Sequence, residues 1–445
     1  MNNTDIKEIC KADSLLSKIL PPIKPCYGIL YIPSQFAISF EYKNRHYVFN
    51  TLTKQCLETV LPETLWAGTD KDFLIENMFM VPKDKDEAAY YSSISTLIRA
   101  YKKKKGIEVY TILPTLGCNA RCIYCYEEGM KQNTMTSDVI EQTVRFVLDT
   151  HNEKQITLSW FGGEPLLYPH IIDYICKGVR EAGIQYKSIM TSNGSLITPE
   201  IVKKMKEDWK LEHIQISMDG GEQDYFIRKQ YYKYQDTYHK VIRAINQMSE
   251  AGIAVTVRCN VDENNWDGIP AFLHDLSNEI SNKTKVGVYF GPLNEVRRSN
   301  NDVIVWKKVK NARSLIENSG FKVAKFLGSG LKFRVNYCMA DRGNVVITPD
   351  GSLFPCEHCP PESRFGDIWN GITDDYARIE FCRVDRVREK CKTCPFLPDC
   401  TSFAACPVKD THCRDVREML TLDALYRLVD KKIESENLDR ESSVC

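Results

Sequence analysis

The sequence has 445 residues, enough for two or three domains rather than one. Its composition is 43% apolar and 27% charged, typical of a globular protein, and the 59 basic residues equal the 59 acidic ones. This balance gives no support to a nucleic-acid partner. Since no export signal and no run of about 18 apolar residues is present, we expect a cytoplasmic protein without a membrane segment.

Cysteine is the residue type with unusual usage. The chain has 18 cysteines, and nine of them fall between Cys338 and Cys413. In a reducing compartment this density predicts metal or cluster ligands rather than disulfides. Six cysteines are scattered singly and are predicted to be ordinary thiols: Cys10, Cys26, Cys56, Cys176, Cys259 and Cys445.

The first 105 residues predict a small separate domain. Short strands are indicated at residues 27–33, 36–42 and 46–50, and helices at residues 57–65 and 84–101. This mixture suits a winged-helix-like α+β module. The basic run that follows, residues 102–105, is most simply a solvated boundary.

From residue 108 to about 300, apolar strand-like runs alternate with helical segments. The predicted strands are residues 109–113, 155–161, 187–192, 212–218, 253–260 and 286–290. Helix starts precede residues 139–150 and 201–208, and residues 302–319 read as one further helix. This alternation predicts an α/β fold with a parallel sheet. Six units are too few for a closed eightfold barrel, so we expect an open, partial (β/α)6 barrel.

Three cysteines follow the first of these strands. Cys118, Cys122 and Cys125 have the spacing C-x3-C-x2-C, with Tyr124 beside the last of them. Cubane iron–sulfur clusters normally take four cysteines, so three on one loop predict a cluster with one iron open to another ligand. Zinc is the alternative, but a zinc site usually has a second pair of ligands, and none lies near Cys118.

Unusual residues also follow the other strands, at the edge where such folds gather their functional groups. In chain order they are Gly162, Gly163, Glu164 and Pro165, then Ser192 and Asn193, then Ser217 and Asp219, and on the fifth strand Arg258 and Asn260. Taken alone, the Asn-Gly and Asp-Gly pairs are ordinary turn signals. Their convergence on one rim with the cysteine loop is more specific.

The cysteine spacing resembles the signature of the radical S-adenosylmethionine (SAM) enzymes. In that family SAM chelates the open iron, and reduction of the 4Fe–4S cluster cleaves SAM to a 5′-deoxyadenosyl radical that abstracts hydrogen from the substrate. The resemblance implies that the Gly-Gly-Glu-Pro segment contacts the SAM amino group. It also implies that the later rim residues and Tyr124 contact the rest of SAM, and that a flavodoxin-like or ferredoxin-like protein supplies electrons.

The C-terminal cysteines resemble the SPASM domain, an extension of some radical SAM enzymes that holds two auxiliary 4Fe–4S clusters. The resemblance implies Cys338, Cys356 and Cys406 as ligands of the first, and Cys391, Cys394, Cys400 and Cys413 as ligands of the second. Cys359 is a candidate fourth ligand of the first cluster; the alternative is a site open to a substrate thiol. Five residues separate Cys400 from Cys406 where the family usually has three, and Cys382 matches nothing. One or two zinc sites are the competing interpretation.

SPASM proteins of this length resemble maturases of ribosomally synthesised peptides, which install thioether or carbon–carbon crosslinks. They also resemble sulfatase-maturing enzymes, which oxidise Cys or Ser to formylglycine. The long N-terminal region favours a peptide maturase whose residues 1–105 bind a leader peptide as an added strand, as in RRE-like domains. Residues 106–320 would then be the radical SAM partial barrel and 321–445 the SPASM domain. Glu357 is a candidate general base, and a non-catalytic zinc-binding module is the alternative from another class.

Overall fold

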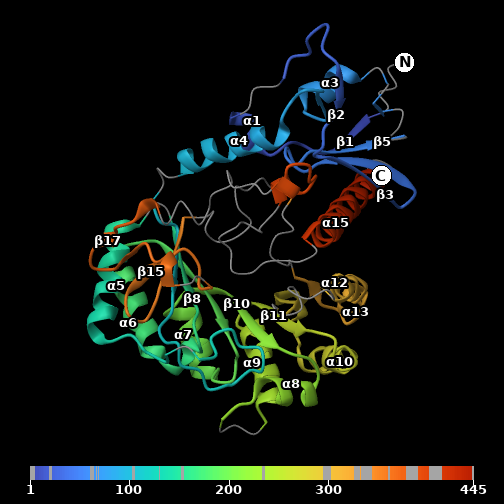
Figure 1. Ribbon diagram of the computed structural model, residues 1–445. Coiled ribbons are helices and arrows are strands. Elements are labelled where there is room, and N and C mark those ends of the chain that lie inside the picture. The colour runs from blue at the N-terminus through green and yellow to red at the C-terminus, as the bar shows by residue number, and fades with distance from the viewer. Residues whose placement is uncertain are drawn as a thin grey trace.

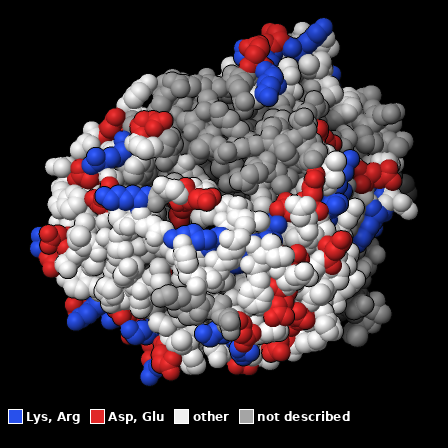
Figure 2. Space-filling model, turned by 60° about the horizontal axis from the view of Figure 1, so that its bottom comes forward, with Lys and Arg blue, Asp and Glu red and all other residues white. Residues whose placement is uncertain are grey.

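The computed structural model describes residues 6–19, 23–60, 65–66, 68, 70–102, 106–129, 131–151, 155–232, 236–293, 302–324, 331, 343–358, 361–376, 389–399 and 413–442. Within these ranges, no helix combines the length and apolar character needed to cross a bilayer. Exposed basic and acidic side chains are interspersed on the face shown in Figure 2.

An 11-stranded sheet forms the centre of the larger part of the molecule (Figure 1). Its six consecutive parallel strands are β7 (Val109–Ile112), β8 (Ile156–Trp160), β9 (Tyr186–Ser192), β10 (Leu211–Met218), β11 (Ala254–Val261) and β12 (Val286–Pro292). They confirm the six predicted strands and their parallel order. Among the described residues, the sheet ends at β13 (Lys322–Val323) on one side and β17 (Gly371–Ile372) on the other, which agrees with the predicted open sheet.

Helices between these strands cover the outer face of the sheet. They are α5 (Ser137–Thr150), α6 (Pro169–Glu181), α7 (Pro199–Glu207), α8 (Glu222–Lys229), α9 (Thr237–Glu250) and α10 (Ile269–Glu279). The start of α7 shows why the chain turns helical there, because the Thr198 side chain accepts from Ile201 N at 3.3 Å and Pro199 occupies the first turn. Alternate strand residues such as Val257 and Val288 are buried under the helices. The other alternate residues face the inner side of the sheet.

The helix predicted over residues 302–319 is two helices, so its continuity was wrong. α12 (Asp302–Asn311) ends before Ala312, and α13 (Arg313–Asn318) follows it. Leu315 N donates to Ala312 O at 3.1 Å, a tighter turn than that of an α-helix, and this turn separates the two segments.

The N-terminal region has a four-stranded antiparallel sheet in the order β1-β5-β4-β3. Its strands are β1 (Ile6–Cys10), β3 (Ala37–Tyr42), β4 (Arg45–Asn50) and β5 (Cys56–Thr59). Around it lie α1 (Ser14–Ile19), the strand pair β2 (Tyr31–Pro33) and β6 (Met80–Pro82), α3 (Lys71–Glu76) and α4 (Glu87–Lys102). The helix predicted over residues 57–65 was wrong for Leu57–Thr59. β5 pairs there with strands on both sides, and this pairing overrides local helical composition.

The N-terminal region shares its cores with the C-terminal segment. Helix α15 (Cys413–Ser442) lies against the sheet (Figure 1), where Tyr426 stacks on Tyr42 with ring centroids 4.3 Å apart. Asp430 pairs with Lys43 at 2.7 Å. Leu397 is buried in the cluster that contains Phe36. The predicted domain limits stay predictions, but the first domain does not pack alone.

The sheet continues into the C-terminal region. β14 (Asn344–Ile347) pairs in parallel with β7, and β15 (Ser352–Phe354), β16 (Gly366–Asp367) and β17 extend the sheet by antiparallel pairing. Cys356 comes two residues after β15, and the ring contact between His358 and Tyr126 brings its segment to the loop that follows Cys125.

Candidate functional site

The cysteine loop after β7 is held by the end of α8. Arg121 N donates to Lys229 O at 3.0 Å, and Ile123 N donates to Arg228 O at 3.1 Å. These backbone hydrogen bonds hold the loop that carries Cys118, Cys122 and Cys125 against the C-terminal end of α8. The loop therefore has a fixed path although it is not a regular element.

The three thiols have the donor types of a cluster site. Within the described part of the chain, no three His, Cys, Asp or Glu side chains are grouped so that they could hold a metal ion. Burial raises the pKa of the Cys118 thiol to about 12, and it also raises the pKa of Cys125. A metal-bound cysteine is a thiolate, so cluster binding would release protons from these groups.

Gly162 and Gly163 allow two loops to meet. A Cβ on Gly163 would lie 2.2 Å from Gly117 O, and one on Gly162, whose φ is +111°, would lie 2.4 Å from Thr115 O. Gly163 N donates to Thr115 O at 3.1 Å, so the loop after β8 packs directly on the cysteine loop. The SAM contact that the resemblance implies for these glycines stays a prediction; within the chain their close neighbour is the cysteine loop.

Glu164 joins the loop after β8 to the end of β9. Its carboxylate is fully buried and accepts from the Ser192 hydroxyl at 2.8 Å, from Asn193 N at 2.8 Å and from Leu166 N at 3.1 Å. Burial raises the pKa of this carboxyl, and the hydrogen bonds oppose that rise. Pro165 follows it in the short 3-10 turn Pro165–Leu167. These contacts assign Glu164 a positioning role for the rim.

Asn193 brings the end of β9 to the cysteine loop. Its Nδ2 donates to Asn119 Oδ1 at 2.9 Å and lies 3.9 Å from Cys118 Sγ. The predicted meeting of these two rim segments is present in the structure.

A second group of predicted residues surrounds Asp219, which is fully buried. Tyr124 donates its hydroxyl hydrogen to Asp219, and Asn260 Nδ2 donates to Asp219 Oδ1 at 2.9 Å. The sequence did not identify Lys229, which lies 3.6 Å from Asp219 Oδ2 and donates to Ser217 Oγ at 2.8 Å. Burial is the largest single influence and lowers the pKa of Lys229, but the negative charges of Asp219, Cys122, Tyr124 and Tyr231 together outweigh it, and the net shift is well upward. The ammonium group therefore stays charged.

Arg258 lies on the inner face of the sheet near this group. Its Nε donates to Asn260 Oδ1 at 2.8 Å. A Cβ on Gly291 would lie 3.0 Å from that Nε, so the glycine leaves room for the guanidinium group beside β12. Further along the inner face, the Tyr289 hydroxyl donates to Gln215 Oε1 at 2.8 Å. Polar groups thus line this side of the strands.

The segment around Cys356 lies against the loop that follows Cys125. The rings of Tyr126 and His358 have centroids 4.0 Å apart. Burial raises the pKa of Glu127 to about 7, and the nearby charge of Glu357 adds a smaller contribution to the rise. Cys356 Sγ lies 3.6 Å from Glu357 Oε2. The candidate base is therefore near the cysteine loop.

The other predicted cluster ligands are only partly described. Cys391 and Cys394 pack against the core that contains Phe36 of the N-terminal region. Cys338, Cys359, Cys400 and Cys406 lie outside the described residues, as does Cys382. Cys413 begins α15, but its side chain is not described. The ligand sets of the two auxiliary clusters stay predictions.

Known protein families decide the class of the site. Residues 112–276 match the model of the radical SAM superfamily. This chain contains a radical SAM domain. The matched region includes the cysteine loop and the rim segments after β8 to β11. A radical SAM domain implies a 4Fe–4S cluster and SAM. The three thiols and the glycines that close the rim on their loop fit that pair of groups.

Among curated proteins, the chain is 22% identical over 273 residues to the antilisterial bacteriocin subtilosin biosynthesis protein AlbA of Bacillus subtilis. That match covers 59% of this chain and 57% of AlbA, so the chain spans little more than half of that relative. It is 23% identical over 345 residues to the cysteine-type anaerobic sulfatase-maturating enzyme of Clostridium perfringens, covering 70% of this chain and 90% of that protein.

The radical SAM fold is also seen in Streptococcus suis SuiB bound to S-adenosylmethionine. The two chains superpose with a TM-score of 0.54 at 16% identity, covering 88% of this chain and 100% of SuiB. SuiB bound to its precursor peptide SuiA superposes with a TM-score of 0.52 at 14% identity, covering 86% of this chain and 100% of SuiB. At this identity the likeness shows a shared fold.

Proposed function

We propose that this chain is a radical SAM peptide maturase that installs an oxidative crosslink, thioether or carbon–carbon, in a ribosomally synthesised precursor. The observation that carries the proposal is the N-terminal region: among the described strands its sheet ends at the edge strand β3, and its helices α1 and α4 share a core with the segment that carries Cys391 and Cys394. A peptide held on that edge would be tethered to the same molecule as the radical SAM site. Relatives that act on peptides support this assignment.

The edge strand β3 can receive an extended peptide. Its turn to β4 has positive φ at Lys43 and Asn44, as in a two-residue hairpin, so Tyr42 and Arg45 form the first hydrogen-bonded pair. By alternation, Ser39 directs its N–H and C=O away from β4. A leader strand would bind to these outward groups.

Ser39→Pro tests this edge, because proline removes the outward N–H and is tolerated on an edge strand. We expect the KM for a leader-bearing peptide to rise at least about tenfold, the loss of roughly 1.4 kcal/mol. SAM cleavage without peptide should not change, and Ser39→Ala is the matched control. Equal KM values for both variants and the parent would rule out leader binding at β3. Deleting residues 1–105 is a poorer test, since it would uncover Leu425 and Val429.

The rim would hold SAM beside the cluster. Cys118, Cys122 and Cys125 would be the cluster ligands. Bound SAM and a reduced cluster supply a one-electron abstraction of a hydrogen atom from carbon. Glu164 keeps the rim closed, and the charged group of Asp219 and Lys229 holds Tyr124 in place beside the cysteine loop. These residues bind and orient, and the N-terminal sheet would select the peptide.

We further propose three 4Fe–4S clusters, two of them in the C-terminal cysteine region. Replacing all three loop cysteines by alanine should lower iron and acid-labile sulfide by about a third. Loss of all the iron would indicate one cluster. Zinc without sulfide would favour the non-catalytic zinc-binding module instead.

Glu357 is the proposed general base, which would remove a proton from the substrate after hydrogen abstraction, while an auxiliary cluster held by the C-terminal cysteines would accept the remaining electron. Glu357→Gln should keep deoxyadenosine formation and lose the modified peptide. Product formed at the parent rate would show that Glu357 has another role.

The second candidate function is oxidation of a Cys or Ser residue to formylglycine. The match to the sulfatase-maturating enzyme favours it, because it covers 90% of that protein. Oxidation of Ser to formylglycine removes two hydrogen atoms, as a crosslink does, so mass alone does not separate the two reactions. A hydrazide reagent would capture the aldehyde of formylglycine and leave a crosslinked peptide unchanged.

A further inference from the structure

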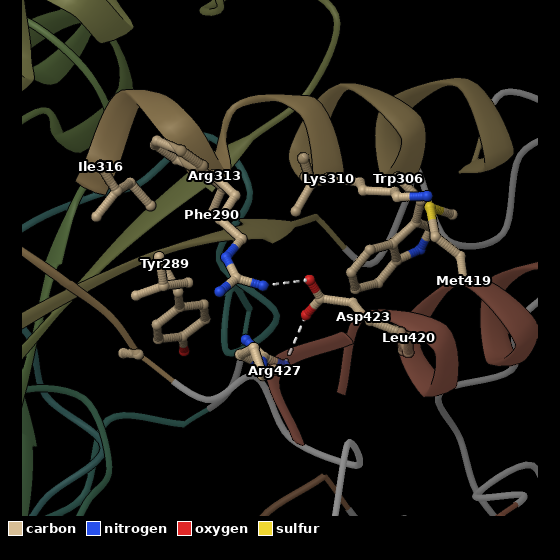
Figure 3. A pocket seen from close by; sticks show the side chains of 13 residues that line it. Tyr289, Phe290, Trp306, Lys310, Arg313, Ile316, Met419, Leu420, Asp423 and Arg427 are labelled. Atoms are coloured by element: carbon tan, nitrogen blue, oxygen red, sulfur yellow. Dashed lines mark hydrogen bonds and ion pairs between the residues drawn. The ribbon is translucent and has the colours of Figure 1, made fainter. Parts of the chain in front are cut away.

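A cavity of about 60 Å³ lies where α12, α13 and α15 meet β12 (Figure 3). Apolar side chains form most of its wall, among them Phe290, Trp306, Ile316, Met419 and Leu420. At about 10–15 Å³ for each water, the space suits four to six small heavy atoms. None of the predicted cluster or SAM residues lines it, so it is separate from the rim described above.

One end of the cavity is charged. Asp423 lies between two guanidinium groups (Figure 3), 3.0 Å from Arg313 Nη1 and 2.6 Å from Arg427 Nη2. Arg313 also pairs with Glu317 at 2.9 Å, and Lys310 lines the same cavity. Three cations, Lys310, Arg313 and Arg427, therefore line the cavity with one carboxylate, Asp423, and Glu317 pairs with Arg313 from outside the wall. The imbalance favours an incoming anion, and among the described residues Arg427 pairs through Nη2 with Asp423, which leaves further N–H donors of its guanidinium group for an anion.

The cavity also lies beside the inner face of the sheet. Tyr289 contributes to its wall, and the hydroxyl of the same residue bonds Gln215 on the inner face. Among the described strands, β13 pairs with β12 only at Gly287 and Val288, so β12 continues past it to Pro292. A chain lying along this part of β12 would reach both the cavity and the inner face.

We propose that this cavity binds an aliphatic side chain of the substrate peptide together with a carboxylate one residue away or at its C-terminus. The apolar wall would take the side chain, and Arg427 would pair with the carboxylate opposite Asp423. Such an anchor would fix the register in which the peptide passes the radical SAM site. The identity of the ligand as a peptide rests on the proposed function; binding of the aliphatic carboxylate does not.

N-acetyl-L-leucine is the probe, since it combines an isobutyl group with a carboxylate. Its binding to the anaerobic, iron-loaded full chain can be followed by saturation transfer to its methyl protons. We expect millimolar affinity, as usual for a ligand of this size. N-acetyl-L-leucinamide, which lacks the charge, and N-acetylglycine, which lacks the side chain, should each bind at least about fivefold more weakly if both features are recognised.

Ala324→Leu places a larger side chain in the cavity wall and should abolish probe binding. Ala271→Leu, on the exposed surface of α10, is the matched control and should bind as the parent does. The midpoint of thermal unfolding of both variants checks folding. If Ala324→Leu unfolds, Arg427→Gln replaces it and should reduce binding of the acid to that of the amide.

Two results would overturn the proposal: no saturable binding of the probe to the parent chain, or equal binding to the parent and to the variants of the cavity. Competition decides the source of the ligand. A precursor peptide that displaces the probe supports the peptide assignment, and one that binds the chain without displacing it means that the cavity serves a free carboxylic acid. This readout needs no turnover, so it can fail or succeed independently of the crosslinking reaction.

Discussion

Lys229→Met should destabilise the radical SAM domain by removing one partner of a buried ion pair. The side chains of Lys229 and Asp219 are 2% and 0% exposed, and their charged atoms are 3.6 Å apart. Loss of one partner of such a pair costs about 3–5 kcal/mol, because the other charge stays buried. Asp219 keeps its hydrogen bonds from Tyr124 and Asn260, so we expect a cost of about 3 kcal/mol.

The assay is thermal unfolding of the anaerobic chain. A loss of this size lowers the midpoint by roughly 6–12 °C for a cooperative unit of 150–250 residues. The matched control is Lys203→Met, whose partner Glu207 lies 3.9 Å away with side chains 73% and 61% exposed. An exposed pair contributes about 0–1 kcal/mol, so this control should shift the midpoint much less.

The double variant Lys229→Met with Asp219→Asn separates the effect of the unpaired charge from the effect of changed side-chain packing. It removes both charges, so it should recover most of the stability that the single variant loses. A midpoint for Lys229→Met equal to that of Lys203→Met would refute the reasoning. So would a double variant that is less stable than Lys229→Met alone.

Three further predictions concern the rim and the sheet. Gly163→Ala would place a Cβ 2.2 Å from Gly117 O, so it should separate the two loops and weaken SAM binding at least about tenfold in a calorimetric titration. Gly221→Ala, whose Cβ would make an ordinary 3.4 Å contact, is the control and should bind SAM nearly as the parent does. Glu164→Ala should cost roughly 2–4 kcal/mol in urea unfolding, because it leaves three buried donors without an acceptor, and a midpoint like the parent's would contradict its positioning role. Burial lowers the pKa of His213, so as pH falls below about 6.5 the unfolded chain binds a proton that the folded chain does not; stability should drop there, and drop less in His213→Gln.

Much of the radical SAM fold could be predicted because its strands are buried on one face under helices. Runs such as residues 253–260 therefore carry both an apolar pattern and clear turn signals at their ends. The helix predicted from residue 57 was wrong, since β5 owes its conformation to pairing with β1 and β4. Local composition holds no information about such partners.

The candidate site was predicted to a similar extent. The carboxyl ends of parallel strands share one edge, so the convergence of the rim segments could be predicted, and the structure adds the direct contacts of Asn260 with Tyr124 and Asp219. Lys229 was missed because its role depends on where α8 ends against the cysteine loop. The sequence signal was weak, since two adjacent basic residues, Arg228 and Lys229, at the end of a helix are common on a solvated surface. The structure shows that both are buried.

The role of the glycines shows a further limit of the sequence. The motif implied that Gly162 and Gly163 contact SAM, and the structure shows that they approach the backbone of the cysteine loop. What they approach could not be read from the motif, because the distance between the two loops depends on the pairing of β7 with β8. The motif thus indicates that small residues are needed at these positions, and the tertiary structure determines which backbone they contact.

The most direct test of the proposed maturase is a mass spectrum of a candidate precursor peptide after anaerobic incubation with the reconstituted chain, SAM and a strong reductant. The account predicts a peptide lighter by two hydrogen atoms, unreactive toward hydrazide, with fragmentation that places the new bond between two residues, and no such product with Cys118→Ala. A peptide of unchanged mass while deoxyadenosine is still released, or a product that hydrazide captures, would contradict the crosslinking function.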